Sequence, residues 1–276
     1  MRVTILGCGT SSGVPLIGCR CAVCTSNEPR NRRRRCAILI DQGATRVLVD
    51  TPPDLRCQCL DAGVDRVDAI IYTHAHADHV NGIDDIRALN FLMDRPLDAY
   101  ADAAVLARIR ERFGYAFLPP EPEQGWWRPA LNPIPIEGPF VIGELPIRPF
   151  EQRHGRLPSW GFRVGGFAYS PDVNGLPEQA LAELAGVDLW LVDCLRERPH
   201  PSHAHLEQTL AWIAEIKPGH AVLTHMNHEI EYWDLKSRLP AGVEPGYDGM
   251  VLELPDPLDR PQRAAAALTS GAERRT

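Results

Sequence analysis

The sequence predicts an α+β fold, a four-layer αββα sandwich in which two mixed β-sheets pack face to face with helices outside. Segments of strand-like composition occur in two batches, and each batch is followed by helical segments. The strands have the short spacing of hairpins with few clear strand–helix–strand units, which argues against a Rossmann-type sheet. At 276 residues and 44% hydrophobic composition, the chain can bury a sizeable core. We expect a single domain over residues 1–276, with its core at about 2–254.

The first batch of strands begins with β-prone residues directly after Met1. Two further extended segments flank the polar turn at residues 41–43, which is typical of a meander. A later apolar run leads into a histidine-rich loop, and the next segment has apolar residues at helical spacing. The expected strands are residues 2–6, 36–40, 46–49 and 67–72, and the expected helices are residues 55–62, 84–93 and 101–113.

The second batch follows a proline-rich stretch at residues 119–149. The expected strands are residues 140–142, 146–148, 162–169, 189–192, 221–223 and 251–254, and the expected helices are residues 178–184 and 206–216. The tail at residues 255–276 has no apolar periodicity, so we expect it to be frayed or loosely docked.

Charge and hydropathy limit the class of protein. A formal net charge of −7 argues against a broad basic face that grips nucleic acid. The one strongly basic run is Arg30–Arg35, and such a run is usually a solvated segment. The apolar stretch at the N-terminus is too short for a signal peptide, and no run approaches the ~18 apolar residues of a membrane span. We therefore expect a cytoplasmic protein without a membrane partner.

The run from Thr73 to His79 places three imidazoles and a carboxylate directly behind the apolar strand 67–72. These groups bind ions such as zinc and manganese, and the H-x-H-x-D-H spacing lets one loop supply two adjacent ions. The alternative is a surface loop that is rich in histidine by chance. The chain has ten histidines in all, so three within six positions favour the metal site.

Three more polar residues occur where an extended run ends: His154, Asp172 and His225. Residues that leave strands at one edge of a sheet sandwich converge in space, so these side chains can join the loop at 74–79. Asp50 and Asp193 also stand at strand ends. Each is a candidate for orienting a metal-binding imidazole through its second nitrogen, with capping of a turn as the alternative.

This pattern resembles the metallo-β-lactamase superfamily, in which H-x-H-x-D-H is followed by a His, a bridging Asp and a last His. The resemblance implies the αββα sandwich and a dinuclear site. It assigns His74, His76 and His154 to the first ion, Asp78, His79 and His225 to the second, and Asp172 to a bridging position. The superfamily includes lactamases, thioesterases, nucleases and phosphodiesterases, so the pattern does not identify the substrate.

Cysteine usage points to a second metal site. Eight cysteines without a secretion signal are more naturally thiols or metal ligands than disulfide partners. Cys19, Cys21 and Cys24 form a C-x-C-x-x-C cluster, and a closed structural zinc site needs a fourth ligand, for which His228 is the candidate. A redox group or a packing group of cysteines is the alternative.

The cysteine cluster together with Thr224-His225-x-x-His228 resembles the phosphoribosyl cyclic phosphate phosphodiesterase family. Ser202-His203-Ala204-His205 and Tyr247-Asp248-Gly249-Met250 match further segments of that family in the same order. The resemblance implies that His203 is catalytic, and we count Asp78 with it. The cysteine cluster is shared with a protein of pyrroloquinoline quinone biosynthesis, so it does not fix the substrate.

These observations predict a phosphodiesterase that uses two divalent ions, Mn²⁺ or Zn²⁺, and carries one structural Zn²⁺. A hydroxide held by the ions would open a small cyclic phosphate, and His203 would assist the leaving oxygen. The expected partner is a small-molecule phosphodiester and not nucleic acid, and a homodimer is possible. The alternatives are a ribonuclease that trims transfer RNA 3′ ends, a hydrolase of lactones or thioesters, and a non-catalytic zinc scaffold.

Overall fold

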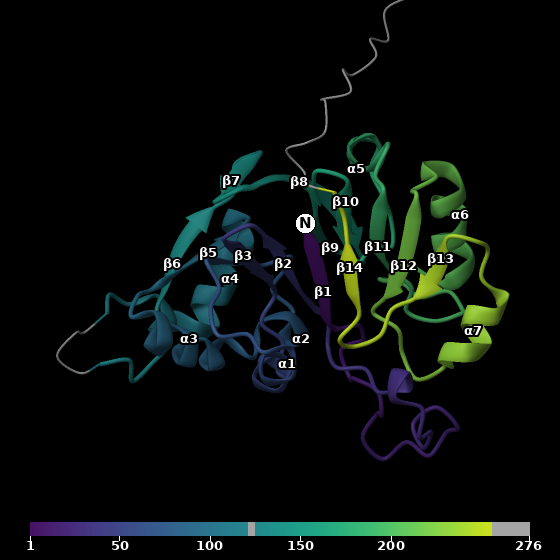
Figure 1. Cartoon of the computed structure of the whole chain (residues 1–276), viewed down its shortest axis with the longest axis horizontal. Coiled ribbons are helices and arrows are strands. Elements are labelled where there is room, and N and C mark those ends of the chain that lie inside the picture. Colours follow the sequence, from purple (N-terminus) through teal and green to yellow (C-terminus); the bar gives the residue numbers. More distant parts are fainter. Residues whose placement is uncertain (121–124, 256–276) are drawn as a thin grey trace, which may run out of the picture.

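Two seven-stranded sheets face each other in the computed structural model, which describes residues 1–120 and 125–255 (Figure 1). The first sheet contains, in spatial order, β14 (Val251–Glu253), β1 (Arg2–Gly7), β2 (Ala37–Gln42), β3 (Thr45–Val49), β4 (Ala69–Ile71), β5 (Leu97–Ala101) and β6 (Leu131–Pro135). The second contains β13 (Val243–Pro245), β12 (His220–Thr224), β11 (Leu189–Asp193), β10 (Phe167–Ser170), β9 (Leu157–Val164), β8 (Leu145–His154) and β7 (Phe140–Ile142).

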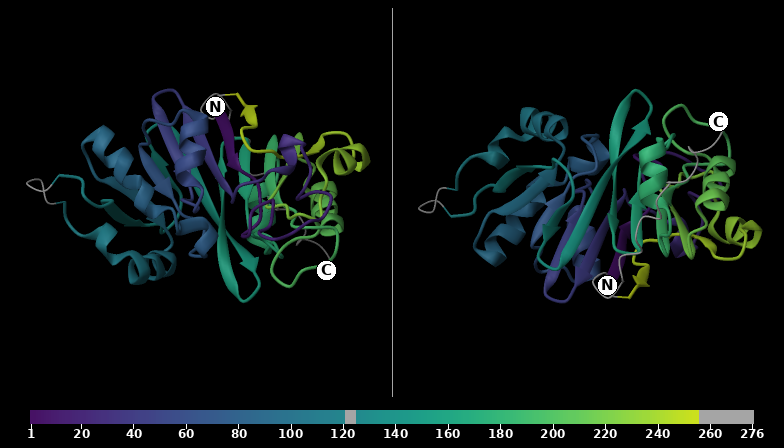
Figure 2. Two further views of the ribbon diagram at one scale, coloured as in Figure 1. Left: turned by 90° about the horizontal axis from the view of Figure 1, so that it is seen from below. Right: turned by 90° about the horizontal axis from the view of Figure 1, so that it is seen from above.

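Helices lie on the outer side of each sheet, so the molecule has four layers (Figures 1 and 2). The α-helices are α1 (Leu55–Ala62), α2 (Ala77–Val80), α3 (Ile86–Met93), α4 (Ala103–Phe113), α5 (Glu178–Leu184), α6 (Leu206–Ile216) and α7 (Tyr232–Arg238). Short 3₁₀ helices are η1 (Pro29–Asn31), η2 (Ile83–Asp85) and η3 (Gly114–Phe117). Helices α1 to α4 pack with the first sheet and α5 to α7 with the second, which confirms the sandwich expected from the sequence.

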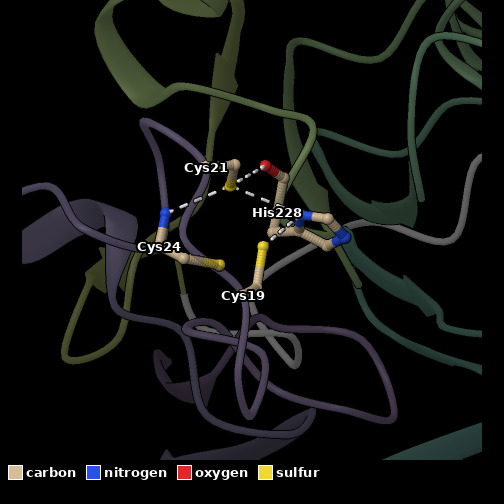
Figure 3. A group of neighbouring side chains, drawn as sticks. All are labelled: Cys19, Cys21, Cys24 and His228. Carbon is tan, nitrogen blue, oxygen red and sulfur yellow. Dashed lines mark hydrogen bonds between the residues drawn. The ribbon is translucent and has the colours of Figure 1, made fainter.

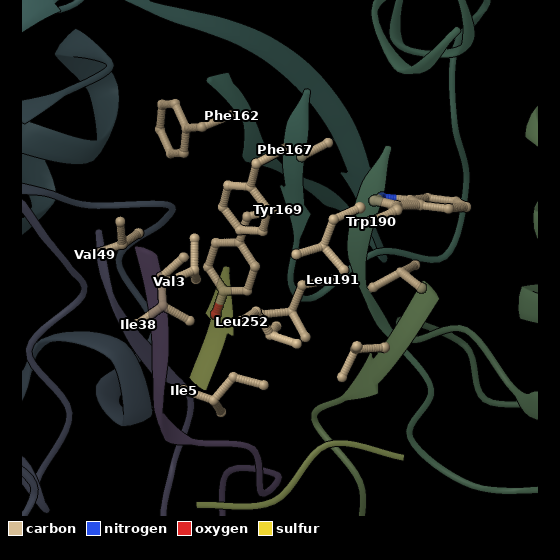
Figure 4. Packing of buried hydrophobic residues seen from close by; sticks show 14 of the residues in the cluster. Val3, Ile5, Ile38, Val49, Phe162, Phe167, Tyr169, Trp190, Leu191 and Leu252 are labelled. Atoms are coloured by element: carbon tan, nitrogen blue, oxygen red, sulfur yellow. The ribbon is translucent and has the colours of Figure 1, made fainter. Parts of the chain in front are cut away.

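The main hydrophobic core fills the space between the two sheets and continues beneath α5, α6 and α7 on the second sheet (Figure 4). Alternate residues of a strand point to the same face, so Val3 and Ile5 of β1 both face this core. Tyr169 and Leu191 meet them from the second sheet. A second cluster, which includes Leu48 of β3, fills the space between the first sheet and its helices.

Two expectations about the strands were wrong. The segment 162–169 is not one strand, because Gly165 adopts a left-handed conformation (φ 57°) and turns the chain between β9 and β10. The expectation of few strand–helix–strand units also fails. Strands β3, β4, β5 and β6 pair in parallel, as do β10, β11, β12 and β13, and each of these six connections contains a helix.

Parallel pairing determines where side chains gather. The carboxyl ends of parallel strands meet at one edge of a sheet, so residues that follow β3, β4, β10, β11 and β12 come together there.

The C-terminal tail at 255–276, which we expected to be frayed, lies outside the described residues except for Pro255. Among the described helices, none combines the length and the apolar character needed to cross a membrane.

Candidate dinuclear metal site

The structure brings the seven His and Asp residues predicted from the sequence together at the carboxyl edges of the two sheets. They form two groups that share one member: His74, His76, His154 and Asp172, and Asp78, His79, Asp172 and His225. Within each group the potential ligand atoms lie within 4.8 Å of one another. This grouping coincides with the division between two ions that the family resemblance implied.

Asp172 stands between the two groups and divides its oxygens between them. Oδ2 lies 3.6 Å from Nε2 of His74 and 3.7 Å from Nε2 of His154. Oδ1 lies 3.1 Å from Nε2 of His79 and 3.3 Å from Nε2 of His225. One carboxylate oxygen thus faces each group, which is the arrangement of a bridging ligand.

Three of the five histidine side chains are fixed by a contact to Nδ1, the ring nitrogen that does not face Asp172. Nδ1 of His79 lies 2.6 Å from Oδ2 of Asp50, and Nδ1 of His74 lies 3.0 Å from the Thr73 hydroxyl. Nδ1 of His154 lies 2.7 Å from the Ser202 carbonyl oxygen. Such outer contacts set the tautomer and direct Nε2 of each ring into the site.

Helix α2, which carries Asp78 and His79, is held against the end of β3 by backbone contacts. The Thr51 N–H donates to the His79 carbonyl (2.8 Å), and the Gly82 N–H donates to the Thr51 carbonyl (2.8 Å). A β-carbon at Gly82 would lie 2.0 Å from the Pro52 carbonyl oxygen, so this approach requires glycine.

Backbone strain concentrates at the site. The described chain has five non-glycine residues at positive φ, and three of them are Asp50 (66°), Asp172 (44°) and His225 (58°). Each follows the last residue of a strand or stands within two residues of it, where the chain must turn to direct a side chain into the cluster. A residue held in this sparsely populated region is a frequent feature of functional sites.

Burial and charge favour a cation. Burial lowers the pKa of His74, His76 and His154 below the usual imidazole value, so these rings are neutral and offer lone pairs. Burial opposes a charge on His79 as well, but Asp172 and other nearby carboxylates raise its pKa well above the usual value. The cluster therefore has a surplus of buried negative charge that a divalent cation would neutralise.

Buried polar atoms without hydrogen-bond partners also indicate that the His/Asp cluster binds metal ions. Among the described residues, several buried side-chain atoms have no hydrogen-bond partner, and the ones that face the cluster are Nε2 of His74, Nε2 of His79, Oδ1 of Asp172 and Nε2 of His225. A buried polar atom without a partner is costly, and coordination of an ion would satisfy all of these. The two groups therefore fit a pair of metal ions, with Asp172 facing both.

His203 lies at the border of the cluster. Its Nε2 is 3.9 Å from Oδ2 of Asp172, and its ring stacks on that of His225 with centroids 4.5 Å apart. Nδ1 contacts Oδ2 of Asp193 at 2.9 Å. Although burial opposes the charge, Asp193 raises the pKa of His203 to about 9. Asp193 therefore orients His203, which is not one of the seven candidate ligands, whereas Asp50 orients the candidate ligand His79.

The three cysteines and His228 form a second cluster, here called the Cys3His cluster (Figure 3). Nδ1 of His228 lies 3.6 Å from the sulfur of Cys19 and 3.5 Å from that of Cys21. The Cys24 N–H donates to the Cys21 sulfur and, with His228 beside it, lowers the pKa of Cys21 to about 6. Three sulfurs and one nitrogen within 4.8 Å are a donor set that fits tetrahedral zinc.

Some contributors to the site carry little signal in the sequence. Thr73 is visible as the residue before the first histidine, but its contact to both Asp50 and His74 depends on the fold. Ser202 acts through its carbonyl oxygen, which any residue could supply. The positive φ at Asp172 and His225 likewise has no marker such as glycine in the sequence.

Comparison with known proteins places this geometry in a family. A model of the beta-lactamase superfamily domain matches residues 45–226. A solved structure described as a new diphosphatase from the PhnP family has a TM-score of 0.86 and 33% identity, covering 92% of this chain and 98% of that one. Zn²⁺-bound PqqB from Methylobacterium extorquens has a TM-score of 0.73 at 21% identity, covering 92% of this chain and all of that one, a likeness that shows the fold.

A second relative is similar to this chain over only part of its own length. A protein of Porphyromonas gingivalis named octanoyltransferase is 37% identical over 253 residues, or 91% of this chain. The chain spans about half of that relative, 51% of its length. From the family match and the two ligand groups around Asp172, the chain belongs to the metallo-β-lactamase superfamily and is a PhnP-like metal-dependent hydrolase.

Proposed function

We propose that the protein is a dinuclear phosphodiesterase that opens a small cyclic phosphate similar to phosphoribosyl 1,2-cyclic phosphate. The observation that carries this proposal is the position of His203, whose Nε2 lies 3.9 Å from the bridging carboxylate of Asp172. A phosphodiester bound at the cluster would therefore have a proton donor within reach of its leaving oxygen. The likeness to a PhnP-family diphosphatase supports phosphate chemistry.

Two divalent ions, when bound by the seven His and Asp ligands, would supply an activated water and offset charge on the phosphoryl group. The protein's own residues supply the rest. Water supplies the oxygen that bonds to phosphorus as the bond between phosphorus and the sugar oxygen breaks, and Nε2 of His203 donates its proton to that sugar oxygen. The proton that the water loses passes to solvent, and solvent protonates His203 again. Asp193 holds Nδ1 of His203 and keeps the ring directed toward Asp172. Asp78 and Asp172 fix the ligand geometry.

The Cys3His cluster has a structural role in this proposal. His228 lies three residues after His225, so zinc at the cluster would tie the cysteine-bearing loop to a segment of the site. The donor set is closed, with three sulfurs and one nitrogen, and leaves no position for a substrate.

Transfer RNA is a less suitable substrate because three of the five arginines in the basic run are engaged within the protein. Arg33 is buried and donates to the Asn227 carbonyl. Arg34 pairs with Asp61, and Arg35 pairs with Asp54. We accordingly propose a small-molecule partner and no nucleic acid.

The test is a substrate panel with purified protein loaded with Mn²⁺ or Zn²⁺. It compares ribosyl cyclic phosphate and 2′,3′-cyclic nucleotides with a lactone, a thioester and labelled transfer RNA. We expect turnover of the cyclic phosphates to exceed that of the lactone and thioester. Preferential cleavage of the lactone or thioester, or salt-sensitive binding and cleavage of transfer RNA, would contradict the proposal.

A further inference from the structure

We propose that Asn174 is a positioning residue that holds the His203 loop against the hairpin bearing His154. This inference rests on the proposed function, because it assigns Asn174 a role in placing the proton donor. Asn174 follows Asp172 by two residues and is half-buried. It is neither a metal ligand candidate nor part of the sequence patterns discussed above.

Asn174 makes three hydrogen bonds to two other segments of the chain. Its side-chain carbonyl accepts from the Gly155 N–H (3.1 Å), at the turn that follows His154. Its side-chain amide donates to the Pro201 carbonyl (2.7 Å), two residues before His203. Its backbone N–H donates to the Arg153 carbonyl (2.8 Å). One residue thus joins the β8–β9 hairpin, the segment after β10 and the loop before α6.

The neighbouring residue secures the other side of the same loop. The Val173 carbonyl accepts from the Ala204 N–H (2.6 Å), and the Val173 N–H donates to Oδ2 of Asp193 (2.9 Å). The same Asp193 oxygen contacts Nδ1 of His203. His203 is therefore bracketed by bonds at Pro201 and Ala204, both made to residues 173–174.

The side chain of asparagine is well matched to this position because it combines a donor with an acceptor. An aspartate in its place would keep an acceptor for Gly155 but would set a carboxylate oxygen against the Pro201 carbonyl. An alanine would lose both contacts. The His154 ring adds a link between the same segments through the Ser202 carbonyl, so release of the loop would be partial and the fold would persist.

The experiment compares two substrates that differ in the need for a proton donor. Bis(4-nitrophenyl) phosphate releases a nitrophenolate that needs no protonation, whereas a 2′,3′-cyclic nucleotide releases an alkoxide that does. We expect Asn174→Ala to lower kcat about 10- to 100-fold for the cyclic nucleotide. With bis(4-nitrophenyl) phosphate we expect a change of less than about 3-fold. Metal content and Tm are measured alongside, and Asn174→Asp should show the same selectivity.

Asn132→Ala is the matched control, since Asn132 bonds Asp98 on the far part of the first sheet and should leave both rates unchanged. In a His203→Ala background, Asn174→Ala should add no further loss for the cyclic nucleotide, because both act on one proton transfer. Equal losses on the two substrates, additive losses in the double variant, or no loss at all would overturn the inference. If the wild-type protein cleaves neither phosphodiester, the proposed function itself has failed.

Discussion

The His/Asp cluster and the Cys3His cluster are held by the chain in different ways. The His/Asp ligands come from strand ends in both sheets and from helix α2, and bonds from Asp50, Thr73 and the Ser202 carbonyl fix three of the rings. The three cysteines lie between β1 and η1, in a stretch without helix or strand. The Cys19 and Cys21 sulfurs contact Nδ1 of His228. The Cys21 sulfur also accepts from the Cys24 N–H, and the Cys24 sulfur accepts from the Leu16 N–H.

This difference indicates what a metal ion would contribute at each cluster. The His/Asp site is preorganised by the sheets, so an ion there adds chemistry more than shape. The Cys3His cluster has few protein contacts that define it, so the ion would contribute directly to the stability of the fold around it. Loss of a ligand should therefore affect turnover at the first site and stability at the second.

The largest expected effect is at His76, the most exposed of the seven candidate ligands. Its Nδ1 lies 3.1 Å from Nε2 of His154, and its removal should open the first group without loss of buried packing. We expect His76→Ala to lower turnover of bis(4-nitrophenyl) phosphate by more than the ~10- to 100-fold typical of an outer contact, with Tm nearly unchanged. The measurement is steady-state kinetics with metal analysis.

His220→Ala provides the control for that variant. His220 begins β12 and pairs with Glu244, away from the cluster, so its loss should leave turnover unchanged. Wild-type turnover in His76→Ala would remove the loop at 74–79 from the proposed mechanism.

Asp50→Asn should have the next largest effect. The carboxylate accepts from the Thr73 N–H and hydroxyl and holds Nδ1 of His79. An amide keeps the volume but weakens the support of His79, so metal affinity at the second group should fall about 10- to 100-fold. Titration with Mn²⁺ or Zn²⁺ measures this. Asp68→Asn, which alters a partly exposed carboxylate, is the control, and equal affinities in both variants would contradict a supporting role for Asp50.

Local patterns account for what the sequence could predict of these regions. The H-x-H-x-D-H loop and the apolar strand before it are contiguous, so the first ligands and their position at a strand end were predictable. Helices α1, α5 and α6 were predicted with the bounds that the structure has. In α6 the apolar residues recur at helical spacing, which marks the helix in the sequence. The grouping of His154, Asp172 and His225 was reachable because each follows or ends an extended run.

Contacts between distant segments could not be predicted in this way. Asn174 meets Gly155 and Pro201 only because the hairpin and the loop before α6 fold over the same strand end. Strand β6 was missed because its sequence, Leu131–Pro135, contains two prolines, which are tolerated at the edge that β6 occupies. Strand β13 is three residues long, and pairing with the longer β12 stabilises it. Strand β5 was also missed, and it is held between β4 and β6 by parallel pairing with both.

Cys21→Ala tests the expectation that loss of a ligand from the Cys3His cluster lowers stability more than turnover. The variant removes a sulfur whose lowered pKa favours the thiolate that zinc binds. We expect Tm to fall by roughly 5 to 10 °C, at about 2–4 °C per kcal/mol, while turnover changes little. Metal content should fall from about three ions per chain to about two. Cys57→Ala, an exposed thiol on α1, is the control, and an unchanged Tm in Cys21→Ala would count against structural zinc.

The smallest expected effect is at Asp248, which holds the two ends of the segment that carries the three cysteines. No metal ligand is involved in these contacts. Asp248 accepts from the backbone N–H groups of Cys8 and Arg34, and burial raises its pKa to about 6. The folded state thus holds this proton more tightly than the unfolded chain, so its stabilising contribution is complete below about pH 4 and is lost as the pH rises through 6.

The asparagine in Asp248→Asn cannot ionise, so the Tm of this variant should lack the pH dependence that Asp248 gives to the wild-type protein. The difference in Tm between the wild-type protein and the variant should shift by a few °C against the wild type between pH 4 and pH 6.5, and remain flat above pH 7. Taking the difference cancels the titration of the metal ligands, which both proteins share. A difference that is constant with pH would show that Asp248 is ionised throughout. The anchor of the cysteine-bearing segment would then be a charged one, and the Cys3His cluster would depend less on its ion than the comparison implies.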